Sequence, residues 1–274
     1  MLERLGRYDE AADAHLLAIS FAEKGNNPRA AAVSKCQLAT VRLLQKNYAE
    51  ALRLYFEVLE IFERLNEPGT VATAWHQIGT VYKDAGQFEP AEDAYQRSLT
   101  IEVRIGASRG QAATLNQLGR LYSSARRHEE AIRLYRQAAD IYVQLGDLLR
   151  ESMVRSNTAN VLANLNQLDD ARREIERAIE CNKTFGHVAE PWKTFDILSD
   201  IERAAGNQSA ALEARNRAIA AYLAYRRDGG APEIDTNQLA GIVEQDREAA
   251  RTAIADPQTP YGLAAEITLI LEKI

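Results

Sequence analysis

The feature that most constrains this sequence is an internal repeat with a period of 40 residues. Six segments align without gaps at that spacing. In chain order they are GRYDEAADAHLLAI, KNYAEALRLYFEVL, GQFEPAEDAYQRSL, RRHEEAIRLYRQAA, NQLDDARREIERAI and GNQSAALEARNRAI. A period of this length predicts an array in which each unit packs only on its neighbours, without one common core.

Small and large residues alternate along the aligned columns. One column holds only alanine, and the column four residues later is large and mostly aromatic. These columns are Ala11, Ala51, Ala91, Ala131, Ala171 and Ala211, then His15, Tyr55, Tyr95, Tyr135, Ile175 and Arg215. The intervening segments, such as TAWHQIGTVYKDAG, share a small column of Ala39, Gly79, Gly119, Ala159 and Ser199. Apolar residues recur at spacings of three and four in both kinds of segment, so both are predicted to be amphipathic helices.

The breaks between these helices are also periodic. Within each unit a turn is predicted near residues 46, 86, 126, 166 and 206. Gly86, Asn166 and Gly206 suit the left-handed conformation that commonly ends a helix. Between units the chain carries further turns that contain Gly or Pro, in LNEPGT, RIGASRG, QLGDLLRE and TFGHVAEPW.

Two units carry a family signature. Trp75, Ile78, Gly79, Tyr82, Ala91 and Tyr95 stand at the signature spacing, as do Leu115, Leu118, Gly119, Tyr122, Ala131 and Tyr135. This pattern resembles the tetratricopeptide repeat (TPR). The period is similar to that of the 40-residue repeats of kinesin light chains, spindle-orientation adaptors and bacterial signalling proteins. The resemblance implies an all-α fold, a right-handed α-solenoid of antiparallel helix pairs (the TPR superhelix).

The repeats and the C-terminal segment predict two regions. Residues 1–228 form a TPR array of half a repeat and about five full repeats, and residues 229–274 form C-terminal capping helices. The capping helices are predicted at residues 235–255 and 260–273. Because the chain begins within the second helix of a unit, without a polar cap, we expect it to be a fragment of a larger protein.

Composition excludes several classes of partner. Acidic and basic residues are mixed, with a formal net charge of -6, which disfavours nucleic acid and anionic membranes. No apolar stretch reaches the length of a membrane span, and the charged start, MLERLGRYDE, does not resemble a signal peptide. Cys36 and Cys181 lie several units apart and are predicted to be unpaired core thiols of a cytoplasmic protein.

The sequence carries no recognisable catalytic or cofactor-binding motif. There is no Gly-rich phosphate loop followed by Lys and Ser/Thr, no GxGxxG and no GxSxG. The four histidines, His15, His76, His128 and His187, have no ligand partner at metal spacing. We therefore expect no catalytic residue, no metal and no cofactor, and conclude that the chain is not an enzyme.

The TPR resemblance also implies where a ligand binds. In that family the first helix of each unit lines a concave face that holds a peptide. The corresponding residues here are His76, Gln77, Thr80, Lys83, Asn116, Arg120, Ser123, Asn157, Asn160, Asn164, Asp196, Asp200 and Arg203. Asn157 and Asn160 resemble the Asn-x-x-Asn pattern with which spindle-orientation adaptors hold a peptide main chain. The alternative is that Asn160 is a solvated residue on an open helix face.

Three functions follow as hypotheses. The first is a non-catalytic scaffold or adaptor that binds a protein or peptide segment in its concave groove. The second is the C-terminal ligand-sensing arm of a larger bacterial signalling ATPase or effector protein. The third is a sensor of a small molecule. Self-association through the incomplete N-terminal repeat is a further possibility, because an unpaired helix face at the end of a solenoid can stack on a second copy.

Overall fold

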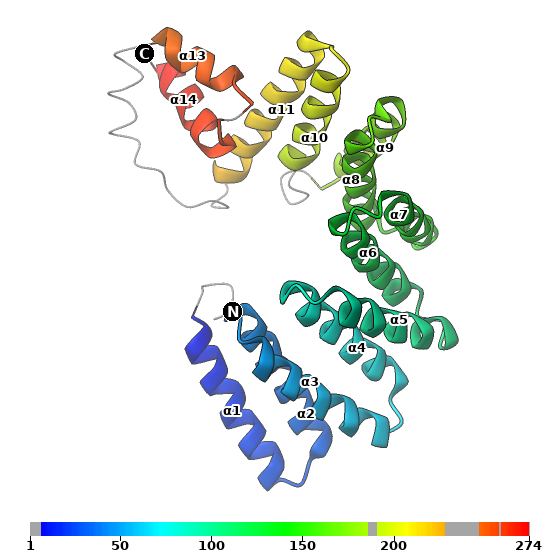
Figure 1. The fold of residues 1–274 in the computed structure, drawn as a ribbon. Coiled ribbons are helices and arrows are strands. Elements are labelled where there is room, and N and C mark those ends of the chain that lie inside the picture. Colours follow the sequence, from blue (N-terminus) through cyan, green and yellow to red (C-terminus); the bar gives the residue numbers. More distant parts are fainter. Residues whose placement is uncertain (1–6, 186–190, 228–246, 258, 274) are drawn as a thin grey trace. The chain divides into compact units, whose positions relative to one another are not determined.

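The structure is a computed structural model that describes residues 7–185, 191–227, 247–257 and 259–273. Its described residues form α-helices and turns, with no strand among them. The first eight helices are α1 (Tyr8–Lys24), α2 (Pro28–Leu44), α3 (Tyr48–Arg64), α4 (Pro68–Asp84), α5 (Phe88–Arg104), α6 (Ser108–Ser124), α7 (His128–Gln144) and α8 (Leu148–Asn164). They are followed by α9 (Leu168–Asn182), α10 (Pro191–Ala204), α11 (Gln208–Arg227), α13 (Arg247–Ala255) and α14 (Tyr261–Lys273). The predicted all-helical array of consecutive antiparallel pairs is confirmed (Figure 1).

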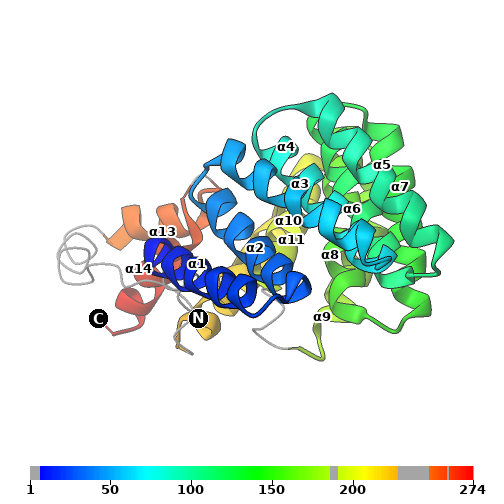
Figure 2. The ribbon, with the colours of Figure 1, turned by 90° about the horizontal axis from the view of Figure 1, so that it is seen from below.

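The described chain forms two compact units, Met1–Ile141 and Tyr142–Ile274. In the first unit α2 contacts both α1 and α3, and further contacts join α3 to α4, α4 to α5 and α5 to α6. Figure 2 shows α1, α2 and α3 side by side, as Figure 1 does. In the second unit α8 contacts α9 and α10, α10 contacts α11, and α11 contacts α14. The predicted boundary between array and capping helices, at residue 228, lies outside the described residues.

The helices follow the sequence period closely. From α1 to α8 every helix has 17 residues, and each helix begins 20 residues after the one before. The residue in the middle of each short connection has a positive φ, including Lys46 at 60°, Gly86 at 75° and Arg126 at 60°. After α4 the Gln87 N–H donates to the Tyr82 carbonyl at 2.9 Å, the 6→1 bond of a Schellman motif. The predicted turns at residues 46, 86, 126, 166 and 206 are thereby confirmed.

The core lies between paired helices and is built from the aligned columns. Ala51, Ala91, Ala131 and Ala171 are completely buried, and Tyr55 and Tyr95 are as well. The small residue on the first helix allows the aromatic ring of the second to lie against its backbone. A Cβ built on Gly79 would stand only 2.6 Å from Cδ1 of Tyr95, and one on Gly119 equally close to Cε1 of Tyr135.

The tyrosine column ends with Arg215, and the structure gives the reason. Arg215 is 4% exposed, and its guanidinium donates to the carbonyl oxygens of Ile254, at 2.7 Å, and Thr259, at 2.9 Å. Ile219 of α11 packs with Ala264 and Ala265 of α14. The last helix of the array is therefore contacted by Ile254 of α13, by Thr259 and by α14. Helix α14 lies within the predicted segment 260–273 and α13 within the predicted segment 235–255. Residues 235–246 of the latter lie outside the described residues, and the division into array and capping region stays a prediction.

Candidate functional site

The first helices of the repeats are α2, α4 and α6 in the first unit and α8 and α10 in the second. We call the predicted ligand-contacting residues on these helices the first-helix face. Their amphipathic pattern places apolar residues such as Ile78 and Leu118 in the core. In the first unit α4 contacts α6, and in the second α8 contacts α10, so neighbouring members of the face are brought close within each unit.

Several predicted residues on α4 are engaged in the structure of the repeat itself. The Thr80 hydroxyl donates to the His76 carbonyl at 3.1 Å and lies 3.1 Å from the Tyr95 hydroxyl. Lys83 is paired with Asp84 at 2.7 Å. Gln77 is half-buried. The same threonine–tyrosine contact recurs between Thr40 and Tyr55 at 2.9 Å, which identifies it as a packing feature of the repeat.

His76 is half-buried and belongs to a hydrogen-bonded chain whose other members, Thr114 and Glu102, are buried. Its Nδ1 lies 2.9 Å from Oγ1 of Thr114, and that hydroxyl donates to Oε1 of Glu102 at 3.2 Å. Burial, with a smaller contribution from Lys83, lowers the pKa of His76 to about 4. Burial also raises the pKa of the carboxyl of Glu102, a residue that is 5% exposed. His76 is therefore neutral at pH 7 and held between elements.

Asn116, Arg120 and Ser123 of α6 differ in accessibility. Asn116 is buried, Ser123 is half-buried and Arg120 is exposed. Arg120 is close enough to Tyr95 and Tyr135 for its charge to oppose the rise that burial causes in the pKa of both hydroxyls. Of these three residues, Arg120 is the one that offers its side chain to solvent.

The second unit contributes the remaining predicted residues. Asn160 and Asn164 of α8 are exposed, and Asn157 is half-buried. On α10, Asp200 is exposed and pairs with Arg203, while Asp196 is half-buried. The accessible polar groups that this unit contributes to the first-helix face are thus amides on α8 and an ion pair on α10.

The structure also bears on metal binding and membrane insertion. No group of three or more His, Cys, Asp or Glu side chains in the described part of the chain is arranged to hold a metal ion. None of the helices in the described ranges is both long and apolar enough to cross a bilayer. Cys36 and Cys181 are free thiols, and burial raises the pKa of each.

Sequence reasoning missed two groups of residues. One group consists of Thr114 and Glu102, which continue the hydrogen-bonded chain that begins at His76. The signal was present, because Glu102 occupies a column that is Phe62 and Tyr142 in neighbouring units. The other is a set around a cavity at Phe195 and Arg217 in the second unit. No single column marks that cavity, because three helices contribute to it.

Comparison with known proteins agrees with this fold. The chain matches a family model described as "Tetratricopeptide repeat" at residues 29–102, 70–144 and 110–184. Together these matches run from residue 29 to residue 184, which is more than half of the chain. No curated protein matches it in sequence.

Solved structures of TPR proteins are similar in fold. BtubC (BKLC) from P. vanneervenii has a TM-score of 0.72 and 20% identity, over 83% of this chain and 94% of that one. A protein of nearly identical TPR-like repeats from a putative kinesin light chain of Podosopora anserina has a TM-score of 0.59 and 18% identity, over 71% of this chain and 96% of that one.

A third similar structure is much longer than this chain. It is a signal transduction ATPase with numerous domains from Pyrococcus horikoshii, which carries a tetratricopeptide repeat sensor. Its TM-score is 0.69 with 16% identity, and the match covers 83% of this chain but 35% of that protein. At such identities these likenesses concern the fold, whereas the family follows from the sequence model. The chain belongs to the tetratricopeptide repeat family.

Proposed function

We propose that this chain is a non-catalytic scaffold that binds a protein or peptide segment through its first-helix face. The observation that carries the proposal is the exposure of polar side chains there: Arg120 in the first unit, and Asn160, Asn164 and Asp200 in the second. Amides can donate to and accept from a peptide main chain, while a guanidinium selects acidic side chains. His76, Thr80 and Asn116 are excluded from this contact set because the structure buries or engages them.

The proposal is tested by pull-down from the source cell. The test variant changes Arg120, Asn160 and Asn164 to alanine, and the matched control changes the exposed second-helix residues Gln96, Gln137 and Glu176. A protein held by wild type and control but lost by the test variant supports the first-helix face. Retention by all three proteins contradicts it. Asn116 is left unchanged because a buried side chain would report on folding instead.

A second candidate is a ligand-sensing arm of a larger cytoplasmic signalling protein of bacterial type. The specific support is the fold likeness to the protein with a TPR sensor from Pyrococcus horikoshii. The match covers 35% of the length of that protein. In this case the ligand would control a catalytic domain elsewhere in the polypeptide. An in-frame nucleotide-binding domain encoded immediately upstream supports it, and an upstream intergenic region with a ribosome-binding site counts against it.

Self-association is a third candidate, through α1. Leu17 and Phe21 lie one turn apart on that helix and are 60% and 65% exposed, and Leu16 beside them is 47% exposed. Apolar side chains at this spacing present one continuous face. Sedimentation that depends on protein concentration, and loses this dependence in Leu17→Glu/Phe21→Glu, supports a dimer. A monomer at every concentration contradicts it.

A further inference from the structure

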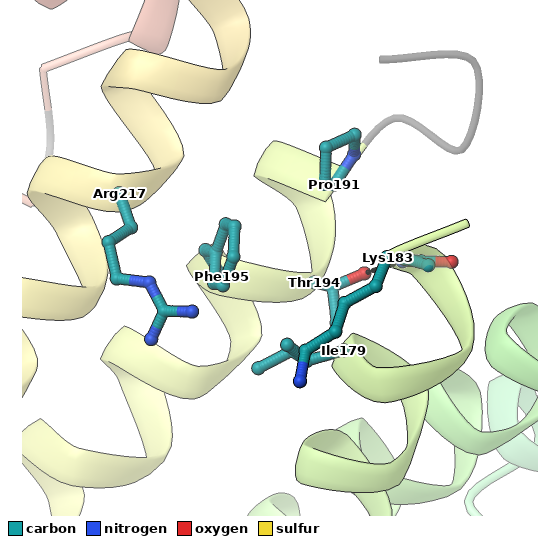
Figure 3. Close-up of a pocket in the computed structure, with 7 residues that line it drawn as sticks. Ile179, Lys183, Pro191, Thr194, Phe195 and Arg217 are labelled. Carbon is teal, nitrogen blue, oxygen red and sulfur yellow. Dashed lines mark hydrogen bonds between the residues drawn. The ribbon is translucent and has the colours of Figure 1, made fainter. Parts of the chain in front are cut away.

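The second unit contains a cavity that the first-helix face does not use. It has a volume of about 180 Å³ and lies where the end of α9, α10 and α11 meet. Its lining residues are Ile179, Asn182, Lys183, Pro191, Thr194, Phe195 and Arg217. Figure 3 shows Arg217 and Lys183 on opposite sides of the Phe195 ring, with Pro191 of the same helix close by.

The walls of the cavity are apolar and its rim is cationic. Ile179, Pro191 and Phe195 supply hydrocarbon surface. The Arg217 guanidinium lies 4.2 Å from the centre of the Phe195 ring, in cation–π geometry. Lys183 is tied to Glu180 at 2.5 Å, so Arg217 is the stronger candidate for a charge that an occupant could meet.

The repeat provides an internal comparison for Arg217. Arg97 and Arg177 occupy the same aligned column. Arg97 also stacks on an aromatic ring, that of Trp75, but pairs with Asp93 at 2.8 Å. Arg177 pairs with Glu151 at 2.9 Å. No carboxylate in the described part of the chain pairs with Arg217, so its positive charge beside an apolar cavity has no such counterpart.

The buried wall of the cavity also carries an amide oxygen without a hydrogen-bond partner among the described residues. Asn182 is 5% exposed, and its Nδ2 donates to Oγ1 of Thr194 at 3.0 Å, whereas its Oδ1 has no hydrogen-bond partner among the described residues. If the amide were turned over, its nitrogen would be the unpartnered atom instead. Since a buried polar atom without a partner is costly, a peptide group that brings both a donor and an acceptor could relieve it in either orientation.

We propose that this cavity holds an apolar side chain of a peptide segment from a partner protein, with an adjacent acidic residue paired to Arg217. The charge complementarity selects a carboxylate, the hydrocarbon walls select an apolar side chain, and Asn182 favours a main-chain amide beside them. The inference rests on the proposed function in one respect, that the ligand is a peptide. It uses a different surface, formed by α9, α10 and α11.

The probes are two capped dipeptides, acetyl-Phe-Glu-amide and acetyl-Phe-Gln-amide, which differ in one charge. Both are titrated into the full chain with labelled isoleucine methyl groups, and the Ile179 signal reports on the cavity. We expect the glutamate peptide to shift this signal and to bind about fivefold or more tightly than the glutamine peptide, because the Arg217 guanidinium pairs more strongly with a carboxylate than with a neutral amide.

Arg217→Gln separates the charge from the cavity. We expect this variant to bind both dipeptides equally, and Arg97→Gln, the matched stacked arginine of the first unit, to keep the preference of wild type. Equal binding of the two peptides by wild type, no shift at Ile179, or an unchanged preference in Arg217→Gln would overturn the proposal. So would 3-phenylpropionate binding as tightly as the glutamate peptide, since this would assign the cavity to a free small acid.

The first-helix variant with Arg120, Asn160 and Asn164 changed to alanine keeps the two proposals apart. It should bind the glutamate dipeptide as wild type does, because none of these residues lines the cavity. Loss of dipeptide binding in this variant would contradict a separate site. If this variant binds the dipeptide and also retains the partner in the pull-down, as wild type and control do, the cavity proposal stands and only the first-helix face is contradicted.

Discussion

Gly79 and Tyr95 show how single residues set the spacing of a helix pair. Gly79 is buried in α4, and its backbone lies against a tyrosine ring that is 0% exposed. A Cβ at this position would stand 2.6–2.9 Å from three ring atoms of Tyr95. The same column holds Ala39 in the preceding unit, so the contact depends on the local distance between helices and not only on the residue type.

We therefore predict that Gly79→Ala is destabilising. Overpacking should outweigh the better helix propensity of alanine, for a net loss of about 1–2 kcal/mol in the free energy of unfolding. The matched control is Gly69→Ala in the same helix, where the new Cβ meets only Ile105 Cδ1 at 3.8 Å. Chemical denaturation should show the control unchanged or slightly more stable. Equal effects of the two substitutions would contradict the packing argument.

His76 makes stability depend on pH. Its pKa is lowered from 6.5 to about 4 in the folded chain, chiefly by burial, so the unfolded chain binds a proton at a pH where the folded chain does not. The stability that this group contributes is present above pH 6.5 and is lost as the pH falls towards 4. His76→Asn copies Asn116 of the next unit. Between pH 7 and pH 5 the free energy of unfolding of this variant should fall by about 1–2 kcal/mol less than that of wild type. Denaturation at both pH values measures the difference, and parallel losses would show that His76 titrates normally.

At the scale of elements, the connections between helices carry a conformational cost that differs from turn to turn. Gly86 and Arg126 occupy corresponding positions, with φ of 75° and 60°. Glycine adopts this left-handed region freely, whereas a Cβ is strained there. Arg126 is exposed, so its side chain is not required for packing.

Exchanging the residue types should have opposite effects at the two turns. Arg126→Gly should raise the free energy of unfolding by up to about 1 kcal/mol, and Gly86→Ala should lower it by about 1 kcal/mol. Thermal denaturation of both variants checks the signs. A loss of stability in Arg126→Gly would mean that the entropy of glycine in the unfolded chain outweighs the relief of strain.

The second unit contains a buried carboxylate that ties α8 to α9. Glu151 is 1% exposed, and its Oε1 forms ion pairs with Nε of Arg155, at 2.8 Å, and Nε of Arg177, at 2.9 Å. Burial raises the pKa of its carboxyl, but the hydrogen bonds from Arg177 and Arg155 outweigh this and lower it overall. Arg155 is held by Glu174 as well, at 2.8 Å, so the ion pairs form a network.

Removing the central charge should be far more damaging than removing an exposed one. Glu151→Gln leaves two arginines without their shared charged partner and should cost about 3 kcal/mol, the lower end for broken buried pairs. Asp93→Asn breaks the pair with Arg97, whose side chains are 61% and 55% exposed, and should cost no more than about 0.5 kcal/mol. Denaturant unfolding compares them. Similar losses would show that the Glu151 network is screened like a surface pair.

At the scale of the molecule, an array of repeats is stabilised by contacts between neighbouring helices, so damage should remain local. The chain offers two natural probes, because its two tryptophans, Trp75 and Trp192, lie one in each compact unit. Trp192→Phe leaves a reporter of the first unit, and Trp75→Phe leaves one of the second.

We predict that Gly79→Ala shifts the unfolding transition reported by Trp75 to lower denaturant and moves the one reported by Trp192 much less. Tryptophan fluorescence in each single-tryptophan background measures the two midpoints, with the unsubstituted backgrounds as controls. Identical shifts in both reporters would show that the two units unfold as one cooperative body.

The sequence by itself determined the helices, their turns and the family. Each of these depends on interactions within one or two units, and the 40-residue period repeats the same local solution, as the positive φ at residues 46, 86 and 126 shows. The small and large columns are also present in the sequence, and the structure buries both, because a helix pair that packs closely needs a small residue opposite a large one.

Only the tertiary structure decided which polar residues are available to a ligand. His76 and Thr114 stand 38 residues apart in sequence but 2.9 Å apart in space, and Asn116, predicted to contact a peptide, is 4% exposed. Arg217 looks like its counterparts Arg97 and Arg177 in the alignment, yet it differs from them in its partners. Burial and partnership depend on side chains contributed by neighbouring helices, and the aligned columns of one sequence do not contain that information.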